Sequence, residues 1–384
     1  MAEGFCLTGG QVYNFERRCF EPARVVVSEN HAVIEKASAA AHSADAPEGW
    51  KAVDVSGCSI LPGLTDFHTH VGRGGGLLPY DPDQFCPETG VSEVQDGGTY
   101  GTDDFDRFAK ETAAESKIRI HALLHVAREG QMHPEAFENQ RPERIDEILL
   151  RDYCEKYSGL ITGFKIRLES VMFEEHYAAA AVEKACGIAS LLPGSRRVMV
   201  HLGRISDMEQ LRDVISVLRP GDIVTHIYQP GVSGFSSPGG IYEELRRAQE
   251  RGVLLDTGFG SRQWSYRTIE NAQISGVIPD TVSSDCNQTN IILPVPVSIQ
   301  YAAAVLRSAG MTEDDLIWRL CANAQRCLNG VKTEELYDRG DLFVFRKADA
   351  ALEMKDMTGA EKRLEQKILP VLTVVRGNIV YRAH

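Results

Sequence analysis

Two histidines at the end of one short apolar segment are the first residues in this sequence that could bind a metal ion. His68 and His70 close the segment Asp66-Phe67-His68-Thr69-His70. Side chains two residues apart on a strand point the same way, so both imidazoles can bind one cation. Alone, the pair is weak evidence, because two histidines on one strand face are more often ordinary surface or core residues.

Two further histidines end apolar runs later in the chain. His201 follows Val198-Met199-Val200, and His226 follows Ile223-Val224-Thr225. Either one alone is best interpreted as a core histidine with satisfied hydrogen bonds. Because both occupy the same place on consecutive predicted strands, together they favour a shared site.

A carboxylate and an amine complete the candidate set. Asp285 ends the run Thr281-Val282-Ser283-Ser284, where a buried charge needs a partner; the alternative is a helix N-cap. Lys165 lies in a predicted interior strand, where burial favours the neutral amine. A neutral amine can add carbon dioxide to give a carbamate that bridges two cations; the alternative is an edge lysine paired with an acid. We identify no other Asp or Glu at the end of an interior strand, so this carbamate would supply a missing anion.

Eight apolar runs alternate with amphipathic stretches between residues 61 and 334. The amphipathic stretches include Asp103–Ser116, Pro142–Tyr157, Glu174–Ala189 and Met208–Leu218. The pattern predicts parallel βαβ units closed into a (β/α)8 barrel, with a doubly wound open sheet as the alternative. The candidate residues then lie at the carboxyl ends of strands, where barrel active sites are found. The predicted strands are Leu64–His70, Val91–Asp96, Ile118–Val126, Thr162–Arg167, Arg197–Leu202, Asp222–Ile227, Leu254–Gly258 and Thr281–Asp285.

Both ends of the chain contain strand-like pieces that are too few to fold separately. They include Arg24–Val27 and Ala32–Ile34 near the start, and Asp341–Phe345 and Leu372–Val380 near the end. We therefore predict one small β-sandwich domain from residues 1–60 and 335–384, beside a barrel domain from 61–334.

Composition excludes several classes of protein. The 384 residues are 43% hydrophobic, which suffices for a large core, and the net charge of −13 disfavours nucleic acid as a partner. The sequence contains no run of 18 apolar residues that would predict a membrane span. Its N-terminus does not resemble a secretory signal. The nine cysteines contain no CxxC pair and indicate free thiols. We expect a cytoplasmic homo-oligomer with a small-molecule substrate and no membrane or nucleic-acid partner.

The chain resembles the amidohydrolase superfamily in its first predicted barrel strand, Pro62-Gly63-Leu64-Thr65-Asp66-Phe67-His68-Thr69-His70. The order HxH, Lys, His, His, Asp is similar to that of binuclear members with a carboxylated lysine, such as dihydroorotases and hydantoinases. The resemblance covers essentially the whole chain. Within the superfamily, Val200-His201-Leu202-Gly203 and Asp256-Thr257-Gly258-Phe259-Gly260 look most like a dihydroorotase-like subgroup that includes acetyl-mandelate esterases and N-acyl amino acid hydrolases.

The resemblance implies a role for each candidate residue. His68, His70 and Asp285 would bind one divalent ion, His201 and His226 the other, and carboxylated Lys165 and a hydroxide would bridge them. Asp285 would also be the catalytic acid and base. Imidazole and carboxylate ligands suit zinc, with manganese or iron as the alternatives. The implied reaction is hydrolysis of an amide or ester bond through the metal-bridging hydroxide.

The sequence leaves the substrate open. Arg204 stands where the subgroup more often has an acid, which suggests a substrate carboxylate. The alternatives to an acyclic amide or ester are a cyclic amide, as in dihydroorotases and hydantoinases, a deaminase, and a non-catalytic paralogue. Five side chains are candidates to hold a substrate anion: Arg204, Arg167, Arg128, Arg262 and Tyr228.

Overall fold

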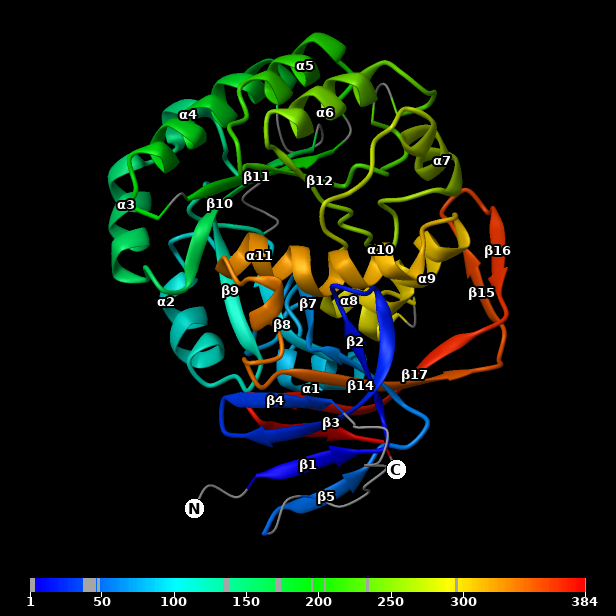
Figure 1. The fold of residues 1–384 in the computed structure, drawn as a ribbon. Coiled ribbons are helices and arrows are strands. Elements are labelled where there is room, and N and C mark those ends of the chain that lie inside the picture. Colours follow the sequence, from blue (N-terminus) through cyan, green and yellow to red (C-terminus); the bar gives the residue numbers. More distant parts are fainter. Residues whose placement is uncertain are drawn as a thin grey trace.

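Seven parallel strands form a curled sheet at the centre of the molecule (Figure 1). The computed structural model describes residues 4–36, 46, 49–133, 138–169, 174–194, 196–203, 205–232, 235–293 and 296–383. Neighbouring strands pair in chain order, as expected from successive βαβ units. The strands are β7 (Leu64–Thr69), β8 (Val91–Asp96), β9 (Arg119–His125), β10 (Ile161–Leu168), β11 (Arg197–Leu202), β12 (Ile223–Thr225) and β13 (Leu254–Leu255).

The segment from Thr281 to Cys286 closes the ring where the eighth strand was predicted. It forms a single parallel bridge, Asp256 with Thr281, rather than a regular strand. On one side the Gly260 amide donates to the Ser284 carbonyl at 2.8 Å, and on the other the Asp285 amide donates to the His68 carbonyl at 2.8 Å. The chain therefore has the predicted (β/α)8 barrel architecture, with an irregular eighth strand.

A small cluster of apolar side chains shows that the sheet curls around an interior. Phe67 of β7 and Met199 of β11 belong to the same cluster, together with Leu123 and Ile223. Because β7 and β11 are not neighbours in the sheet, their side chains can share a cluster only across the inside of a barrel.

Helices surround the barrel and bury their apolar faces against it (Figure 1). Helix α7 begins at Ser265, whose side chain accepts from the Thr268 amide in a capping box. Among the described residues, no helix is long and apolar enough to cross a membrane. The helices are α1 (Pro82–Phe85), α2 (Phe105–Phe108), α3 (Glu147–Lys156), α4 (Ala178–Ser190), α5 (Met208–Ser216), α6 (Ile241–Glu250), α7 (Tyr266–Ile274), α8 (Gln288–Ile292), α9 (Ile299–Ser308), α10 (Glu313–Ile317) and α11 (Ala324–Asn329).

Strands from both ends of the chain build a second, nine-stranded sheet (Figure 1). Its central pair joins the two ends of the chain, because β14 runs antiparallel to β6. The division into two domains at residues 60 and 335 stays a prediction. The strands are β1 (Phe5–Thr8), β2 (Gln11–Asn14), β3 (Cys19–Ser28), β4 (His31–Lys36), β5 (Lys51–Asp54), β6 (Ser59–Pro62), β14 (Leu342–Ala348), β17 (Lys367–Val375) and β18 (Asn378–Arg382).

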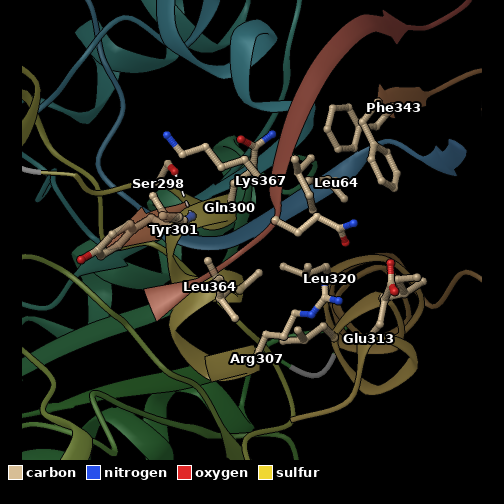
Figure 2. A pocket seen from close by; sticks show the side chains of 18 of the residues that line it. Leu64, Ser298, Gln300, Tyr301, Arg307, Glu313, Leu320, Phe343, Leu364 and Lys367 are labelled. Carbon is tan, nitrogen blue, oxygen red and sulfur yellow. Dashed lines mark hydrogen bonds between the residues drawn. The ribbon is translucent and has the colours of Figure 1, made fainter. Parts of the chain in front are cut away.

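A hairpin that the sequence pattern did not predict extends beside α9. It pairs β15 (Leu352–Lys355) with β16 (Glu361–Leu364). An apolar pocket of about 290 Å³ lies between this hairpin, α9, α10 and the second sheet (Figure 2).

Candidate metal centre

The six candidate residues come from five separate segments of the barrel. His68 lies near the end of β7, with His70 just beyond it, and Lys165 lies within β10. The remaining three are His201 of β11, His226 directly after β12, and Asp285 of the closing segment. His226 and Asp285 both have a left-handed backbone conformation, with φ of 66° and 49°, respectively. Such strained conformations in non-glycine residues concentrate at functional sites.

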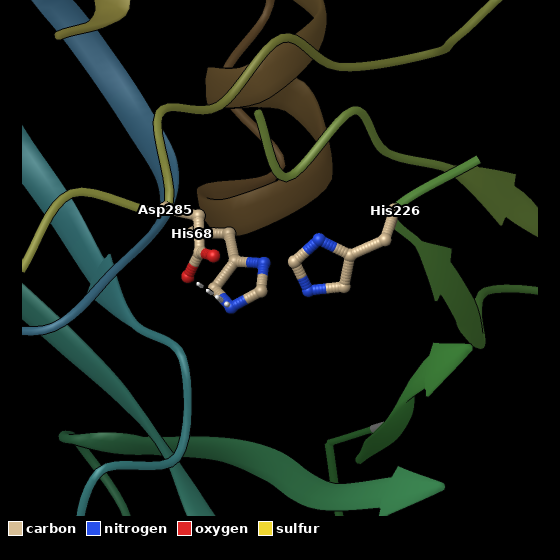
Figure 3. A group of neighbouring side chains, drawn as sticks. All are labelled: His68, His226 and Asp285. Carbon is tan, nitrogen blue, oxygen red and sulfur yellow. Dashed lines mark ion pairs between the residues drawn. The ribbon is translucent and has the colours of Figure 1, made fainter. Parts of the chain in front are cut away.

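Asp285 and Lys165 both approach the histidine pair of the first barrel strand. Asp285 Oδ1 lies 3.2 Å from Nε2 of His70 and 3.6 Å from Nε2 of His68. Lys165 Nζ lies 3.1 Å from the same His68 Nε2. Figure 3 shows His68 and Asp285 side by side, with His226 facing them. The predicted set from three distant parts of the sequence therefore meets in one place.

His201 and His226 complete the cluster from the other side. Their ring centroids are 3.9 Å apart, and the His226 ring lies 5.2 Å from that of His68. Ligand atoms of His68, His226 and Asp285 all lie within 4.8 Å of one another. Nε2 of His201 and Nε2 of His226 are buried without a hydrogen-bond partner among the described residues. Buried polar atoms are normally satisfied, so these two nitrogens fit the role of metal ligands.

Hydrogen bonds at Nδ1 orient the rings of three of the histidines. The Thr225 hydroxyl lies 3.0 Å from Nδ1 of His68, and the Thr99 hydroxyl lies 2.8 Å from Nδ1 of His70. His226 Nδ1 lies 2.7 Å from the Gly258 carbonyl, which can only accept. Each contact favours a proton on Nδ1 and leaves the Nε2 lone pair for a metal ion.

Two buried carboxylates, which sequence reasoning missed, anchor these threonines. Thr225 donates to Asp256 at 2.8 Å, and Thr99 donates to Asp96 at 2.6 Å. Asp96 ends β8 and Asp256 follows β13, so the expectation that Asp285 alone ends an interior strand was wrong. Asp96 and Asp256 could have been identified in the sequence, because each is a carboxylate after an apolar run, which is the pattern that identified Asp285. Both lie behind the histidines, so they add negative charge around the centre.

Burial sets the protonation of the cluster. It lowers the pKa of Lys165 to about 8, which makes the neutral amine accessible near neutral pH. Burial, with the nearby Lys165 charge, lowers the pKa of His68 to about 4, and burial lowers that of His226 to about 3. Burial raises the pKa of Asp285, but its contact with His70 and the electrostatic influence of the neighbouring histidines outweigh burial, and the net shift is downward. At neutral pH the centre thus offers neutral imidazoles at His68 and His226 and a carboxylate at Asp285.

Two glycines after β8 make room for the centre. A Cβ on Gly97 would lie 2.2 Å from Cδ2 of His68, and a Cβ on Gly98 would lie 2.2 Å from Cβ of Lys165. Gly98 also has a φ of +84°, which side chains rarely adopt. Any larger residue at either position would displace a candidate ligand.

Arg167 lies two residues after Lys165 on the same strand and is held by an acid. Its Nε donates to Oε2 of Glu138 at 2.9 Å, and a second guanidinium nitrogen contacts Oε1. His125 Nε2 lies 3.3 Å from the same carboxylate. Burial raises the pKa of Glu138, but its contacts with His125 and Arg167 outweigh burial and lower the pKa to about 2. This cluster of three polar side chains, also unpredicted, lies beside the candidate metal centre, since Arg167 pairs with His201 in the strand register.

The other residues predicted to bind the substrate anion do not gather at one site in the described part of the chain. Arg128 is exposed and pairs with Asp103 at 3.1 Å. Tyr228 is buried in the apolar core, 6.2 Å from Phe259 between ring centroids. The Arg262 side chain is exposed, and Arg204 lies outside the described residues.

Comparisons with known proteins agree with this arrangement. No protein-family model matches the chain. A deacetylase of Agrobacterium fabrum is 28% identical over 356 residues, covering 90% of this chain and 84% of that protein. A deacetylase of Brucella anthropi is 29% identical over 352 residues, covering 89% and 85%. A dihydroorotase structure aligns with a TM-score of 0.84 at 24% identity, covering 99% of this chain and 98% of its own. An adenine deaminase structure aligns with a TM-score of 0.84 at 19% identity, covering 99% of both chains.

The barrel and these similarities define the class of fold. The chain shares the fold of the dihydroorotase and adenine deaminase structures, and it is similar over most of its length to the two deacetylases.

Proposed function

We propose that the protein is a metal-dependent hydrolase that removes an acyl group, most simply acetyl, from an amide or ester of a small carboxylate-bearing substrate. The observation that carries this proposal is the convergence of His68, Lys165, His226 and Asp285. The buried Nε2 atoms of His201 and His226 add to it, because neither has a hydrogen-bond partner among the described residues. The two relatives described as deacetylases support acyl transfer to water over the other reactions.

The donor set fits two divalent cations, which we propose are zinc. His68, His70 and Asp285 would hold one ion, His201 and His226 the other, and Lys165, as a carbamate, would hold both. When bound, such ions lower the pKa of a shared water and polarise a carbonyl oxygen.

Asp285 is the residue placed to move the proton. Its lowered pKa keeps it ionised at neutral pH, so it can accept a proton from the attacking water. The contact of its Oδ1 with His70 holds the carboxylate toward the centre. Its left-handed backbone fixes this orientation from the closing segment of the barrel. The same group can then return the proton to the leaving nitrogen or oxygen.

Recognition of a carboxylate is assigned to the arginines near the centre, with Arg167 the nearest one described. Its position two residues after Lys165 directs it to the same end of the barrel. Bidentate contact with Glu138 fixes its guanidinium plane.

A substrate panel tests the proposal. The metal-loaded enzyme would be assayed with N-acetyl amino acids, acetyl esters of hydroxy acids, and cyclic ureides, with Asp285→Asn as the control for contaminating activity. We expect acetate release from the first or second group. Turnover confined to cyclic ureides would establish the cyclic amidase alternative instead, and no turnover in any group would contradict the proposal.

A further inference from the structure

The apolar pocket between the barrel and the second sheet contains none of the six residues of the metal centre. Its walls come from α9, α10, β14 and the β15–β16 hairpin, and its floor includes Leu64, the first residue of β7. Leu320, Phe343 and Leu364 add apolar surface (Figure 2). At about 290 Å³ it lies at the lower end of the range of small-molecule sites.

Two cations border this apolar space. Arg307 of α9 and Lys367 of β17 extend from opposite sides of the pocket in Figure 2. Within the part of the chain that the structure describes, neither charged group has a hydrogen-bond or ion-pair partner in the protein. Both side chains are half-buried rather than fully solvated.

The acid in the pocket does not neutralise these cations. Glu313 pairs with Lys347, with a closest nitrogen–oxygen distance of 2.6 Å. The pocket therefore keeps an excess of positive charge, although the whole chain has a net charge of −13. Local positive charge on an acidic protein attracts anions to that place.

We propose that this pocket binds a small amphiphilic carboxylate, with its apolar chain or ring against the leucines and phenylalanine and its anionic group at Arg307. A guanidinium suits this role, because it can donate two parallel hydrogen bonds to a carboxylate. Lys367 adds charge at the opposite edge. The apolar walls account for the rest of the ligand, since they are the surface that gains by exclusion of water. The site is separate from the metal centre and does not depend on the reaction proposed above.

Calorimetric titration of the metal-loaded enzyme with sodium octanoate tests the site. We expect saturable binding that weakens about tenfold in Arg307→Gln, because a hydrogen bond to a charged group is lost. Lys51→Gln is the matched control, since Lys51 is an exposed cation on β5, which does not line the pocket. Octan-1-ol, which lacks the anionic group, should bind more weakly than octanoate. Equal affinity of the two compounds would overturn the role of the cations.

A carboxylate could also bind to the metal centre, and a second variant separates the two sites. Ala304→Phe fills the pocket from α9 and leaves all six residues of the metal centre in place. We expect it to abolish octanoate binding while metal content is kept. Unchanged binding in both Ala304→Phe and Arg307→Gln would overturn the proposal, as would the absence of saturable binding to the wild-type enzyme. If Ala304→Phe lowers the melting temperature, the Arg307→Gln result decides, because the half-buried Arg307 side chain has no partner to lose among the described residues.

Discussion

The hydroxyl oxygen of Thr225 lies 3.0 Å from Nδ1 of His68 and 2.8 Å from Oδ2 of Asp256. The Asp256 carboxylate can only accept hydrogen bonds, so the Thr225 hydroxyl donates its hydrogen to Asp256. The Thr225 oxygen then accepts a hydrogen bond from Nδ1 of His68. Thr99 links His70 to Asp96 in the same way. Two neighbouring histidines are thus fixed as Nδ1-protonated tautomers by separate threonine–aspartate pairs.

We predict that Thr225→Val weakens metal binding by about 10- to 100-fold, the usual effect of losing a group that orients a metal ligand. Valine keeps the shape but cannot accept from His68. Competition with a fluorescent chelator measures the affinity, and Thr225→Ser, which keeps the hydroxyl, is the control. Equal affinity of the valine and serine variants would show that this contact does not position His68.

We predict about two metal ions per chain, most simply zinc, in protein prepared without chelators. Elemental analysis by mass spectrometry measures the content. The expectation follows from six potential ligands and two buried Nε2 atoms without partners in the described chain. His201→Ala should lower the content toward one ion, since His201 belongs to the second ligand group. Protein without stoichiometric metal would contradict the assignment.

We predict that Lys165 is carboxylated in the metal-loaded enzyme. Two divalent cations in a buried site repel each other, and an ammonium at Lys165 would add to that repulsion. Burial already lowers the pKa of this amine to about 8, which favours reaction with carbon dioxide. Lys165→Ala should lose nearly all activity and regain part of it with added acetate or propionate. An intact mass without the added carboxyl group, under conditions that preserve carbamates, would refute the prediction.

Sequence periodicity predicted the barrel because its strands are buried on both faces and form continuous apolar runs. It overestimated the last three strands. The predicted strand Asp222–Ile227 is observed only as Ile223–Thr225, since His226 turns to a φ of 66°. A histidine at this position does not by itself predict such a turn, because the surrounding barrel imposes the backbone conformation. The hairpin β15–β16 was missed because its strands are short and half exposed.

The convergence of the six candidate residues was predictable because they interrupt apolar runs with groups that burial would otherwise penalise. The residues that orient the histidines were harder to predict from the sequence. Thr99 and Thr225 are common strand and turn residues, and their contacts with His70 and His68 depend on distances across the barrel. The pairing of Glu138 with Arg167 joins a loop to β10 and likewise has no local sequence pattern.

We predict that Asp285→Asn leaves a folded, metal-binding protein that loses about 10²- to 10⁴-fold in kcat, the usual range for a general base. The amide cannot accept the proton from water. Steady-state kinetics on the best acetylated substrate measures the loss, with circular dichroism and metal analysis as controls. Activity within a few-fold of wild type would exclude the assigned role.

The last prediction concerns stability away from the metal centre. Glu93 of β8 is fully buried and contacts both Arg339, at 2.9 and 3.0 Å, and His121, at 2.8 Å. Burial raises its pKa, but these partners outweigh burial and lower the pKa to about 2. A carboxyl group whose pKa is lower in the folded state stabilises the protein at pH values above its unfolded-state pKa of about 4.5. That stabilisation is lost as the pH falls toward 2.

Glu93→Gln should therefore lower the free energy of unfolding by about 3–5 kcal/mol at pH 7, because it leaves the charge of Arg339 unpaired. The difference from wild type should shrink below pH 4.5 in urea unfolding measured across that range. The exposed Glu115→Gln variant is the control, and a difference independent of pH would contradict the ionised pair.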